Sequence, residues 1–490
     1  MSLFASKYSK SSHRAISHLN RRCLGIPELK QIQSHLIIAG AIADPFAAGK
    51  LIAHFAIFDL SHTQALFQLL PQRSTSIWNT IIRAFIENHK PENALSLYKQ
   101  MLGSNFLPNN YTFSFVFRAC SELCDVSLGL MYHTHVIRLG WECYDFVQNG
   151  LIHCYASCRS MKTARKLFDA SSKRDVITWT AVINGYLKIR EDGAAKELFD
   201  QMPERNEVSW SAMINGYVQM GLFKEALEMF NDMQVAGMRL NQSGAVGLLS
   251  ACASLGALEQ GRWIHAYIDR IKMEVDRVLG TALIDMYSKC GCIDMACYVF
   301  EKMSCRDVFA YTSIISGLAN HGESATAIEL FKRMEDEGIR PNNITLICVL
   351  SACSRMGLVE EGLRIFKSMK DVYGIEPGSQ HYGCLVDLIS RAGLLEQAIK
   401  VVREMPMNPD SYVLGALLSA CRVHGDIDIG KEMVEGLDEG RLDHSGIHVL
   451  VSNIYASIGQ WDDVERVRKG MEEKNVKKVP GFSLIEVEGL

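Results

Sequence analysis

The chain has 490 residues and a formal net charge of -4, with 48% hydrophobic and 22% charged residues, so it can bury a large core. The mild acidity argues against a protein that binds nucleic acid through charge alone, but it allows a binder that reads bases on a local face. The 15 cysteines, without a secretory signal, fit a reducing compartment, and no run of 18 apolar residues predicts a membrane span.

The first predicted element is a targeting segment at residues 1–26. It is basic and rich in serine, and the first acidic residue of the chain is Glu28. Its positive charges are carried by Lys7, Lys10, Arg14, Arg21 and Arg22. Such a composition is typical of mitochondrial and chloroplast transit peptides, and a biased, unstructured start is the alternative. We therefore predict import into the mitochondrion, which the arginine pair favours, with the chloroplast as the alternative because of the serines.

A phrase in the middle of the chain is repeated at a regular distance. VITWTAVINGY at 176–186 returns 31 residues later as EVSWSAMINGY at 207–217. Its anchor position, held by Trp179 and Trp210 in these copies, has counterparts from Trp78 to Leu414 at successive intervals of 35, 35, 31, 31, 35, 35, 31, 35, 36 and 32 residues. A period in this range predicts a solenoid of stacked supersecondary units.

Each repeat is predicted to be a pair of helices. In the repeat 207–241, apolar residues recur at i, i+3, i+4 and i+7 from Trp210, which is one face of a helix. Gly221 interrupts the pattern, a second apolar stripe follows, and Gly237 marks the predicted end of the second helix. Two helices alone cannot bury both stripes, so neighbouring repeats must stack. The predicted fold is therefore all-α, an α-solenoid superhelix of stacked antiparallel helix pairs, with the anchor aromatic in the core.

The predicted repeat array covers residues 27–410. Its repeats are 45–74, 75–109, 110–144, 145–175, 176–206, 207–241, 242–276, 277–307, 308–342, 343–378 and 379–410. Residues 411–490 are predicted to form a C-terminal extension.

The repeat ends and openings resemble those of a known family. GIRPN at 338–342 and FLPNN at 106–110, together with the VSWSAMINGY opening, are similar to the pentatricopeptide repeat. The alternation of 35- and 31-residue repeats resembles the P, L and S variants of the plant PLS subfamily. The tetratricopeptide repeat is the competing helix pair, but it does not alternate in length and its small-residue signature does not occur here.

The C-terminal extension resembles the E1 and E2 segments of plant organellar editing factors. The similar stretches are SYVLGALLSACRVHGDIDIG and HVLVSNIYASIGQWDDVERVRKGMEEKNVKKVPGFSLIEVEGL. In many relatives a cytidine deaminase domain follows, whereas this sequence stops at Leu490. The resemblance implies an E-type protein without the DYW deaminase domain, which takes no cofactor and is not an enzyme.

The zinc signature of nucleoside deaminases is incomplete in this sequence. The signature needs H-x-E and a later P-C-x-x-C, in which His and two Cys bind the zinc and Glu transfers protons. His321, Gly322 and Glu323 match the first part, but no Pro-Cys and no C-x-x-C occurs in the 490 residues. We therefore predict no catalytic residues and no metal site.

The cysteines follow the repeat period. Those that lie seven residues after an anchor are Cys120, Cys252, Cys353 and Cys421. Cysteines in phase with a repeat are expected to be small buried core residues. The nearest approach to a metal-binding cluster is formed by His153, Cys154 and Cys158, for which a metal site is the alternative to a place in the repeat core.

The resemblance also implies how the array would bind RNA. In the family, the fifth and the last residue of a repeat read one base, and the second residue lies between neighbouring bases. The fifth-and-last pairs predicted to bind RNA are Asn79 with Asn109, Asn149 with Asp175, Thr180 with Asn206, Ser211 with Asn241, Thr281 with Asp307, and Thr312 with Asn342. In that order they favour a pyrimidine, U, A, A, G and A. The predicted second residues are Phe146, Ile177, Val208, Val278 and Phe309. Because Ser, Thr, Asn and Asp are also common helix N-caps, a purely structural role is the alternative.

The remaining repeats carry no readable pair. Their fifth and last residues are Gly49 with Ser74, Ser114 with Tyr144, Val246 with Asp276, Ile347 with Gly378, and Gly383 with Asp410. Val246 and Ile347 have no side-chain group that could form a hydrogen bond with a base. We assign no base to any of these five repeats. The predicted RNA for repeats 75–410, with its 5′ end toward the protein N-terminus, is Y-n-U-A-A-n-G-A-n-n.

The sequence thus predicts a sequence-specific, single-stranded RNA-binding protein of an organelle. It would be a specificity factor for C-to-U editing that recruits a deaminase in trans. The implied partners are single-stranded organellar RNA, a deaminase-bearing pentatricopeptide relative and small organellar editing factors. The alternatives are an RNA-binding protein for transcript stabilisation or splicing, and a helical-repeat scaffold for protein partners. The E1 and E2 resemblance favours editing, and the paired residues argue against the scaffold.

Overall fold

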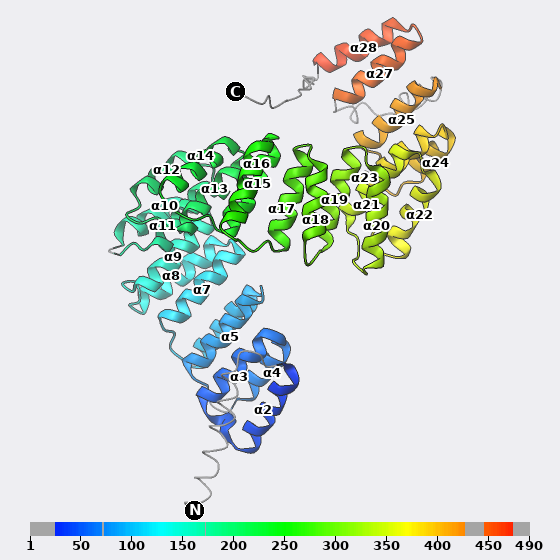
Figure 1. The fold of residues 1–490 in the computed structure, drawn as a ribbon. Helices are drawn as coiled ribbons and strands as arrows, with labels where there is room; N and C mark the ends of the chain where they lie inside the picture. The colour runs from blue at the N-terminus through cyan, green and yellow to red at the C-terminus, as the bar shows by residue number, and fades with distance from the viewer. Residues whose placement is uncertain (1–24, 71–72, 172, 427–444, 474–490) are drawn as a thin grey trace, which may run out of the picture. The chain divides into compact units, whose positions relative to one another are not determined.

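The computed structural model describes residues 25–70, 73–171, 173–426 and 445–473. All regular elements in these ranges are helices (Figure 1), which confirms the predicted all-α class. In the same ranges no helix is both long and apolar enough to cross a membrane. The predicted targeting segment lies outside the described residues up to position 24, and the first described helix begins at Ile26.

The chain divides into two compact units, residues 1–239 and 240–490, each of which is described by itself. The helices of the first unit are α2 (Ile26–Ile38), η1 (Ala41–Ala43), α3 (Pro45–Phe58), α4 (Leu60–Leu69), α5 (Thr75–Glu87), α6 (Pro91–Gly103), α7 (Asn110–Leu123), α8 (Val126–Arg138), α9 (Asp145–Ser157), α10 (Met161–Ala170), α11 (Val176–Lys188), α12 (Asp192–Gln201), α13 (Glu207–Met220) and α14 (Phe223–Val235).

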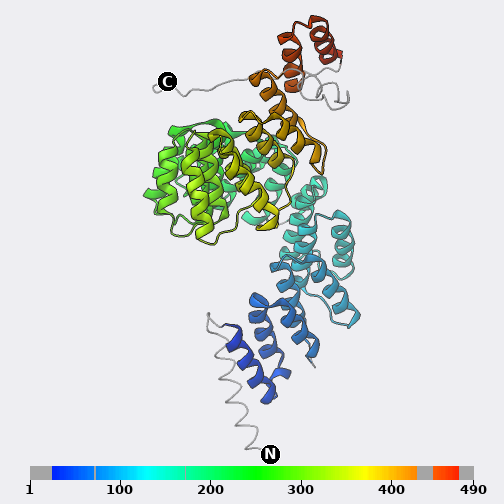
Figure 2. The ribbon, with the colours of Figure 1, turned by 90° about the vertical axis from the view of Figure 1, so that its right-hand side faces the viewer.

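The second unit continues the same alternation. Its helices are α15 (Gln242–Leu255), α16 (Leu258–Arg270), α17 (Arg277–Lys289), α18 (Ile293–Lys302), α19 (Val308–Asn320), α20 (Ser324–Asp336), α21 (Asn343–Met356), α22 (Val359–Asp371), α23 (Ser379–Arg391), α24 (Leu395–Glu404), α25 (Ser411–His424), α27 (Ser445–Ser457) and α28 (Trp461–Glu473). Figures 1 and 2 show both units as successions of antiparallel helix pairs.

The first helix of a repeat lies beside the first helix of the next. In the first unit α5 packs against α7, α7 against α9, and α9 against α11; in the second unit α15, α17, α19, α21 and α23 follow one another in the same way. This stacking confirms the predicted solenoid of helix pairs. Since first helices are neighbours, residues at the same position of successive repeats form rows along each unit.

The anchor aromatics of the repeated phrase are buried packing residues. Trp179 on α11 meets the ring of Phe168 edge-on, with ring centroids 4.7 Å apart. The guanidinium of Arg174 lies over the Phe168 ring at 4.9 Å, and its Nε donates to the Phe168 carbonyl oxygen at 3.0 Å. The same arrangement recurs around Trp210 and Tyr311. Because these aromatic faces are covered by protein, they cannot stack on a base.

The glycine of the repeated phrase permits close contact between repeats. A Cβ atom at Gly185 on α11 would lie 2.9 Å from the Ala156 Cβ of α9 and would overlap the thioether of Met161. Ala156 belongs to a helix and cannot move aside easily, so only glycine fits here without a shift. The "ING" of the phrase therefore reflects helix packing.

Replacing Gly185 with Ala should destabilise the protein relative to the same change at Gly193. Both glycines are in helices, but a Cβ at Gly193 meets no atom within 4 Å. Alanine is the better helix former at both positions, and most so at Gly185 in the helix interior, so a loss of stability at Gly185 measures overpacking, about 1–3 kcal/mol. Urea denaturation followed by circular dichroism measures both free energies of unfolding. Equal stability of the two variants would contradict the packing role of Gly185.

The beginning of the C-terminal extension is part of the repeat core. One face of α25 packs against α23, where Val413 and Leu417 join Leu385 in a buried cluster. The other face of α25 contributes Leu414 to a cluster with Val451 of α27. The helices α27 and α28 pack on each other as another pair. The remainder of the predicted E1 and E2 segments, 427–444 and 474–490, lies outside the described residues.

Candidate nucleic-acid interface

Where the last residue of a repeat is Ser, Asn or Asp, its side chain caps the first helix of the next repeat. Asn206 Oδ1 accepts hydrogen bonds from the backbone N–H groups of Val208 at 3.1 Å and Ser209 at 3.0 Å. Asp307 Oδ1 accepts in the same way from Phe309 and Ala310, both at 3.0 Å. The structural role named as the alternative is therefore present. Capping engages only Oδ1, so Nδ2 of an Asn or Oδ2 of an Asp remains for another partner at the helix start.

The fifth and the last residue are in direct contact in two of the predicted pairs. Asn79 Nδ2 donates to Asn109 Oδ1 at 3.0 Å. Asn149 Nδ2 donates to Asp175 Oδ2 at 3.1 Å. These side chains come from the first helix of one repeat and the cap of the next. The structure thus brings together residues that are separated by 30 and 26 positions in the sequence.

A third side chain, which the sequence analysis missed, connects these pairs. Thr112, the third residue of α7, donates from Oγ1 to Asn79 Oδ1 at 2.7 Å and to Asn109 Oδ1 at 3.0 Å. The Oγ1 of Thr345 lies 2.6 Å from the Oγ1 of Thr312 and donates to Asn342 Oδ1 at 3.0 Å. The available signal was a Ser or Thr at the third position of four repeats, namely Thr112, Thr178, Ser209 and Thr345.

Threonine at the fifth position is oriented by its own helix. The Oγ1 atoms of Thr180 and Thr281 donate to the carbonyl oxygens four residues earlier, at 2.6 and 2.7 Å. Because the hydroxyl proton is used in this bond, the oxygen keeps its lone pairs as acceptors. Thr180 and Asn206 are both described, and no hydrogen bond joins them in the structure.

The fourth predicted pair, Ser211 with Asn241, has one member in each compact unit. Ser211 is buried in α13 of the first unit. Asn241 caps α15 of the second unit, where its Oδ1 accepts from the Gly244 N–H at 2.9 Å.

The predicted second residues are exposed apolar side chains in each of the two units. Phe146, Ile177, Val208, Val278 and Phe309 are 57% to 71% exposed, although all are large and apolar. The second residues of three other repeats, Phe46, Tyr111 and Ile344, and Tyr412 at the same position of α25 are exposed in the same way and were missed. An exposed row of apolar side chains requires an explanation, because burying it would be favourable. Its position beside the polar pairs is what a chain of stacked bases would require.

A cavity of about 410 Å³ in the second unit contains one complete predicted site. Thr281 and Asp307 line it together with Val278 and Phe309, the second residues of two successive repeats. The other residues that line it are Val246, Ser250, Arg277, Ala282, Asp285 and Ser313. The cavity therefore combines a pair of hydrogen-bonding groups with apolar side chains from both neighbouring repeats. This combination suits a flat aromatic ring with a polar edge, such as a nucleobase.

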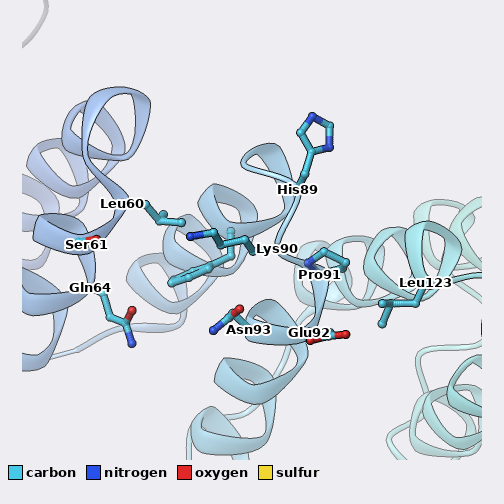
Figure 3. Close-up of a pocket in the computed structure, with 10 residues that line it drawn as sticks. Leu60, Ser61, Gln64, His89, Lys90, Pro91, Glu92, Asn93 and Leu123 are labelled. Carbon is cyan, nitrogen blue, oxygen red and sulfur yellow. The ribbon is translucent and has the colours of Figure 1, made fainter. Parts of the chain in front are cut away.

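A larger cavity of about 530 Å³ in the first unit contains none of the predicted site residues. It lies between α4, the turn that joins α5 to α6, and the end of α7. Figure 3 shows that polar side chains, among them Gln64, Lys90 and Asn93, form much of its lining. It is thus separate from the row of fifth and last residues.

His321 and Cys154, which belong to the two candidate metal-binding motifs of the sequence, both form hydrogen bonds within the fold. His321 follows the end of α19, and its Nε2 lies 2.6 Å from the Ser288 carbonyl oxygen. The Cys154 thiol is hydrogen-bonded to Cys120 and buried, and both effects raise its pKa. A protonated buried thiol is a poor metal ligand. Within the described ranges, no group of three or more His, Cys, Asp or Glu side chains could hold a metal ion.

Comparison with known families agrees with the repeat period. The model of the PPR repeat family matches residues 73–122 and 306–355. The PPR repeat model matches residues 177–207, 208–238, 281–308, 344–372 and 381–408. The E motif model matches residues 424–486.

Curated proteins of Arabidopsis thaliana are similar over nearly the whole chain. The pentatricopeptide repeat-containing protein At5g48910 is 39% identical, over 96% of this chain and 76% of its own length. A mitochondrial member, At2g22410, is 34% identical over 99% and 87% of the two chains. A chloroplastic member, At5g59200, is 39% identical over 98% and 87%.

Among solved structures, the chain is similar to the maize pentatricopeptide repeat protein PPR10 in complex with an 18-nt psaJ RNA element. The TM-score is 0.46 at 14% identity, over 96% of this chain and 87% of the other. The extent and identity of the match to the Arabidopsis relatives show the family. The chain therefore belongs to the pentatricopeptide repeat family, and its repeats and E motif fit the PLS-type E class.

Proposed function

We propose that this protein binds single-stranded RNA of an organelle and acts as a specificity factor for C-to-U editing, working with a deaminase supplied in trans. The observation that carries the RNA-binding part is the cavity around Thr281 and Asp307, between the exposed side chains of Val278 and Phe309. A base inserted there would lie between apolar side chains and direct its edge toward the polar pair.

The geometry supports a chemical basis for choosing between purines. As a cap, Asn206 keeps an Nδ2–H donor available, whereas Asp307 keeps an Oδ2 acceptor. The Watson–Crick edge of adenine has an acceptor at N1, and that of guanine has donors at N1 and N2. Asn206 and Asn342 would therefore favour adenine, and Asp307 would favour guanine.

A binding assay tests the RNA-binding part of this proposal. The purified protein should bind an RNA that contains Y-n-U-A-A-n-G-A-n-n more tightly than RNAs with single changes at the read positions. Each mismatch should cost about 1–3 kcal/mol, by analogy with base-pair mismatches in protein–DNA recognition. Equal affinity for matched and fully scrambled RNAs would refute sequence-specific binding.

The editing part of the proposal is supported by the E motif match at residues 424–486. Sequencing the organellar transcripts of a knockout plant tests it. Loss of one C-to-U change is the expected result, and altered transcript ends or retained introns with intact editing would favour stabilisation or splicing instead.

We expect the purified 490-residue chain to show no cytidine deaminase activity on its target RNA, with or without added zinc. The reason is chemical: the sequence has an H-x-E but no P-C-x-x-C to complete the zinc ligands. Conversion of cytidine to uridine by the recombinant chain is measured by sequencing the RNA after incubation. Any turnover above that of a buffer control would contradict this prediction.

Organellar import is supported by the basic, serine-rich residues 1–26 and by relatives assigned to the mitochondrion and the chloroplast. A fluorescent fusion to the C-terminus should enter an organelle, and we propose the mitochondrion. A fusion that lacks residues 1–26 should stay in the cytosol. Cytosolic fluorescence of the full-length fusion would exclude both organelles.

A further inference from the structure

The cavity around Thr281 contains an arginine for which base reading provides no role. Arg277 is the first residue of α17, lines the cavity and is exposed. In the described ranges no carboxylate forms an ion pair with it, although Asp285 and Asp307 line the same cavity. Asp285 is instead paired with Lys289, at 2.8 Å. The Arg277 guanidinium is therefore available to a ligand in the cavity.

This arginine is unusual among the repeats. The first residues of the other first helices, none of them Lys or Arg, are Pro45, Thr75, Asn110, Asp145, Val176, Glu207, Gln242, Val308, Asn343, Ser379 and Ser411. The first residue of a helix does not need a positive charge for the helix to form. A positive charge at this end is mildly unfavourable, because the N-terminus of a helix already carries a partial positive charge. The charge at position 277 thus has no evident benefit for the fold.

The repeat before Arg277 lacks a complete pair for reading a base, because its last residue is Asp276 but its fifth position is apolar. The fifth residue of the repeat 242–276 is Val246, which lines the same cavity and has no hydrogen-bonding atom in its side chain. An RNA strand that passes from this repeat to Thr281 would therefore meet a complete fifth-and-last pair only at the repeat 277–307. A contact to the strand's backbone would fix the nucleotide that Val246 cannot bind.

The negative charges near the cavity are a second reason to expect that a cation contacts the RNA. Asp276 caps α17, and the hydrogen bond from the Leu279 N–H and the charge of Arg277 lower its pKa, so that it is ionised at neutral pH. With Asp307 it places two carboxylates near the path of the strand. Without Arg277 these charges would repel the phosphates.

We propose that Arg277 binds the phosphate that joins the nucleotide opposite repeat 242–276 to the nucleotide opposite repeat 277–307. Its planar guanidinium can donate two parallel hydrogen bonds to phosphate oxygens. This inference rests on the proposed RNA-binding function and adds to it a backbone contact at a repeat that reads no base.

The variant Arg277→Gln tests the contact, and Lys367→Gln is its matched control. Lys367 is exposed on α22, a second helix, and loses the same charge. Affinity for the predicted RNA is measured by fluorescence anisotropy over a range of salt concentrations. For Arg277→Gln we expect about fivefold weaker binding at 0.1 M salt and a log–log salt slope smaller by about 0.7, while discrimination between A and G stays unchanged. An unchanged slope, or the same change in the control, would overturn the assignment.

A neutral methylphosphonate at the predicted linkage gives a second, independent readout. It should weaken binding to the wild-type protein and have no further effect on Arg277→Gln. Equal losses for both proteins would place the contact at another residue and overturn the proposal. Failure of the wild-type protein to bind any RNA would instead refute the proposed function, so the two failures are distinguishable.

Discussion

Replacing Asn206 with Asp should move the preference of repeat 176–206 from adenine toward guanine. The change should lower affinity for the RNA with A at this position and raise it for the RNA with G. Each effect should be about 1–3 kcal/mol, which is roughly five- to 150-fold in Kd. Competition binding with two RNAs that differ only at this base measures both effects.

The fold should tolerate this substitution. Asp175 and Asp307 already cap equivalent helices through Oδ1, as Asn206 does. The substitution therefore keeps the cap and replaces the Nδ2 donor by an acceptor. Asn206→Ser is the matched control, since serine also caps helices but has no second polar atom, and it should discriminate poorly between the two bases. Equal loss of affinity for both RNAs in Asn206→Asp would show that Asn206 is only a cap.

Ending the chain after Asp426 should abolish editing in the plant while RNA affinity stays close to that of the full-length protein. All predicted base-reading residues lie at or before Asn342, whereas the E motif match begins at position 424. Removing residues 427–490 would thus remove the proposed surface for the deaminase and leave the proposed RNA interface intact. Complementation of a knockout plant measures editing, and anisotropy measures RNA binding. Restored editing by the truncated protein would contradict a role for the tail.

The place of the truncation follows from the packing of α25. Cutting at 410 would expose Leu385 and Val386, which pack against Val413 and Leu417 of α25. Exposing such a cluster costs several kcal/mol, so that loss of editing could result from unfolding. A chain that ends after Asp426 retains this cluster, and on α25 it exposes only Leu414 and Leu418, which pack against α27. Circular dichroism of the truncated protein should therefore show the helical signal of the repeats.

The repeat period alone was sufficient to predict the helical architecture. Successive first helices begin at the predicted repeat starts, for example α11 at Val176 and α19 at Val308. The reason is local: a short polar residue such as Asp175 or Asp307 caps the helix, and the apolar residues that follow recur with the period of a helix face. The family could likewise be inferred from phrases such as VSWSAMINGY, and the E motif from the C-terminal stretch SYVLGALLSACRVHGDIDIG and the residues that follow it.

The sequence determined which positions of each repeat belong to the candidate site, namely the polar fifth and last residues and the apolar second residue. It could not show which atoms remain available, because this depends on contacts between repeats. Only the folded chain brings Thr112 between Asn79 and Asn109, or Arg277 into one cavity with Val246. The physical reason is that each candidate site is built from side chains of neighbouring first helices, whose spacing and orientation are decided by the buried aromatic and glycine contacts of the solenoid.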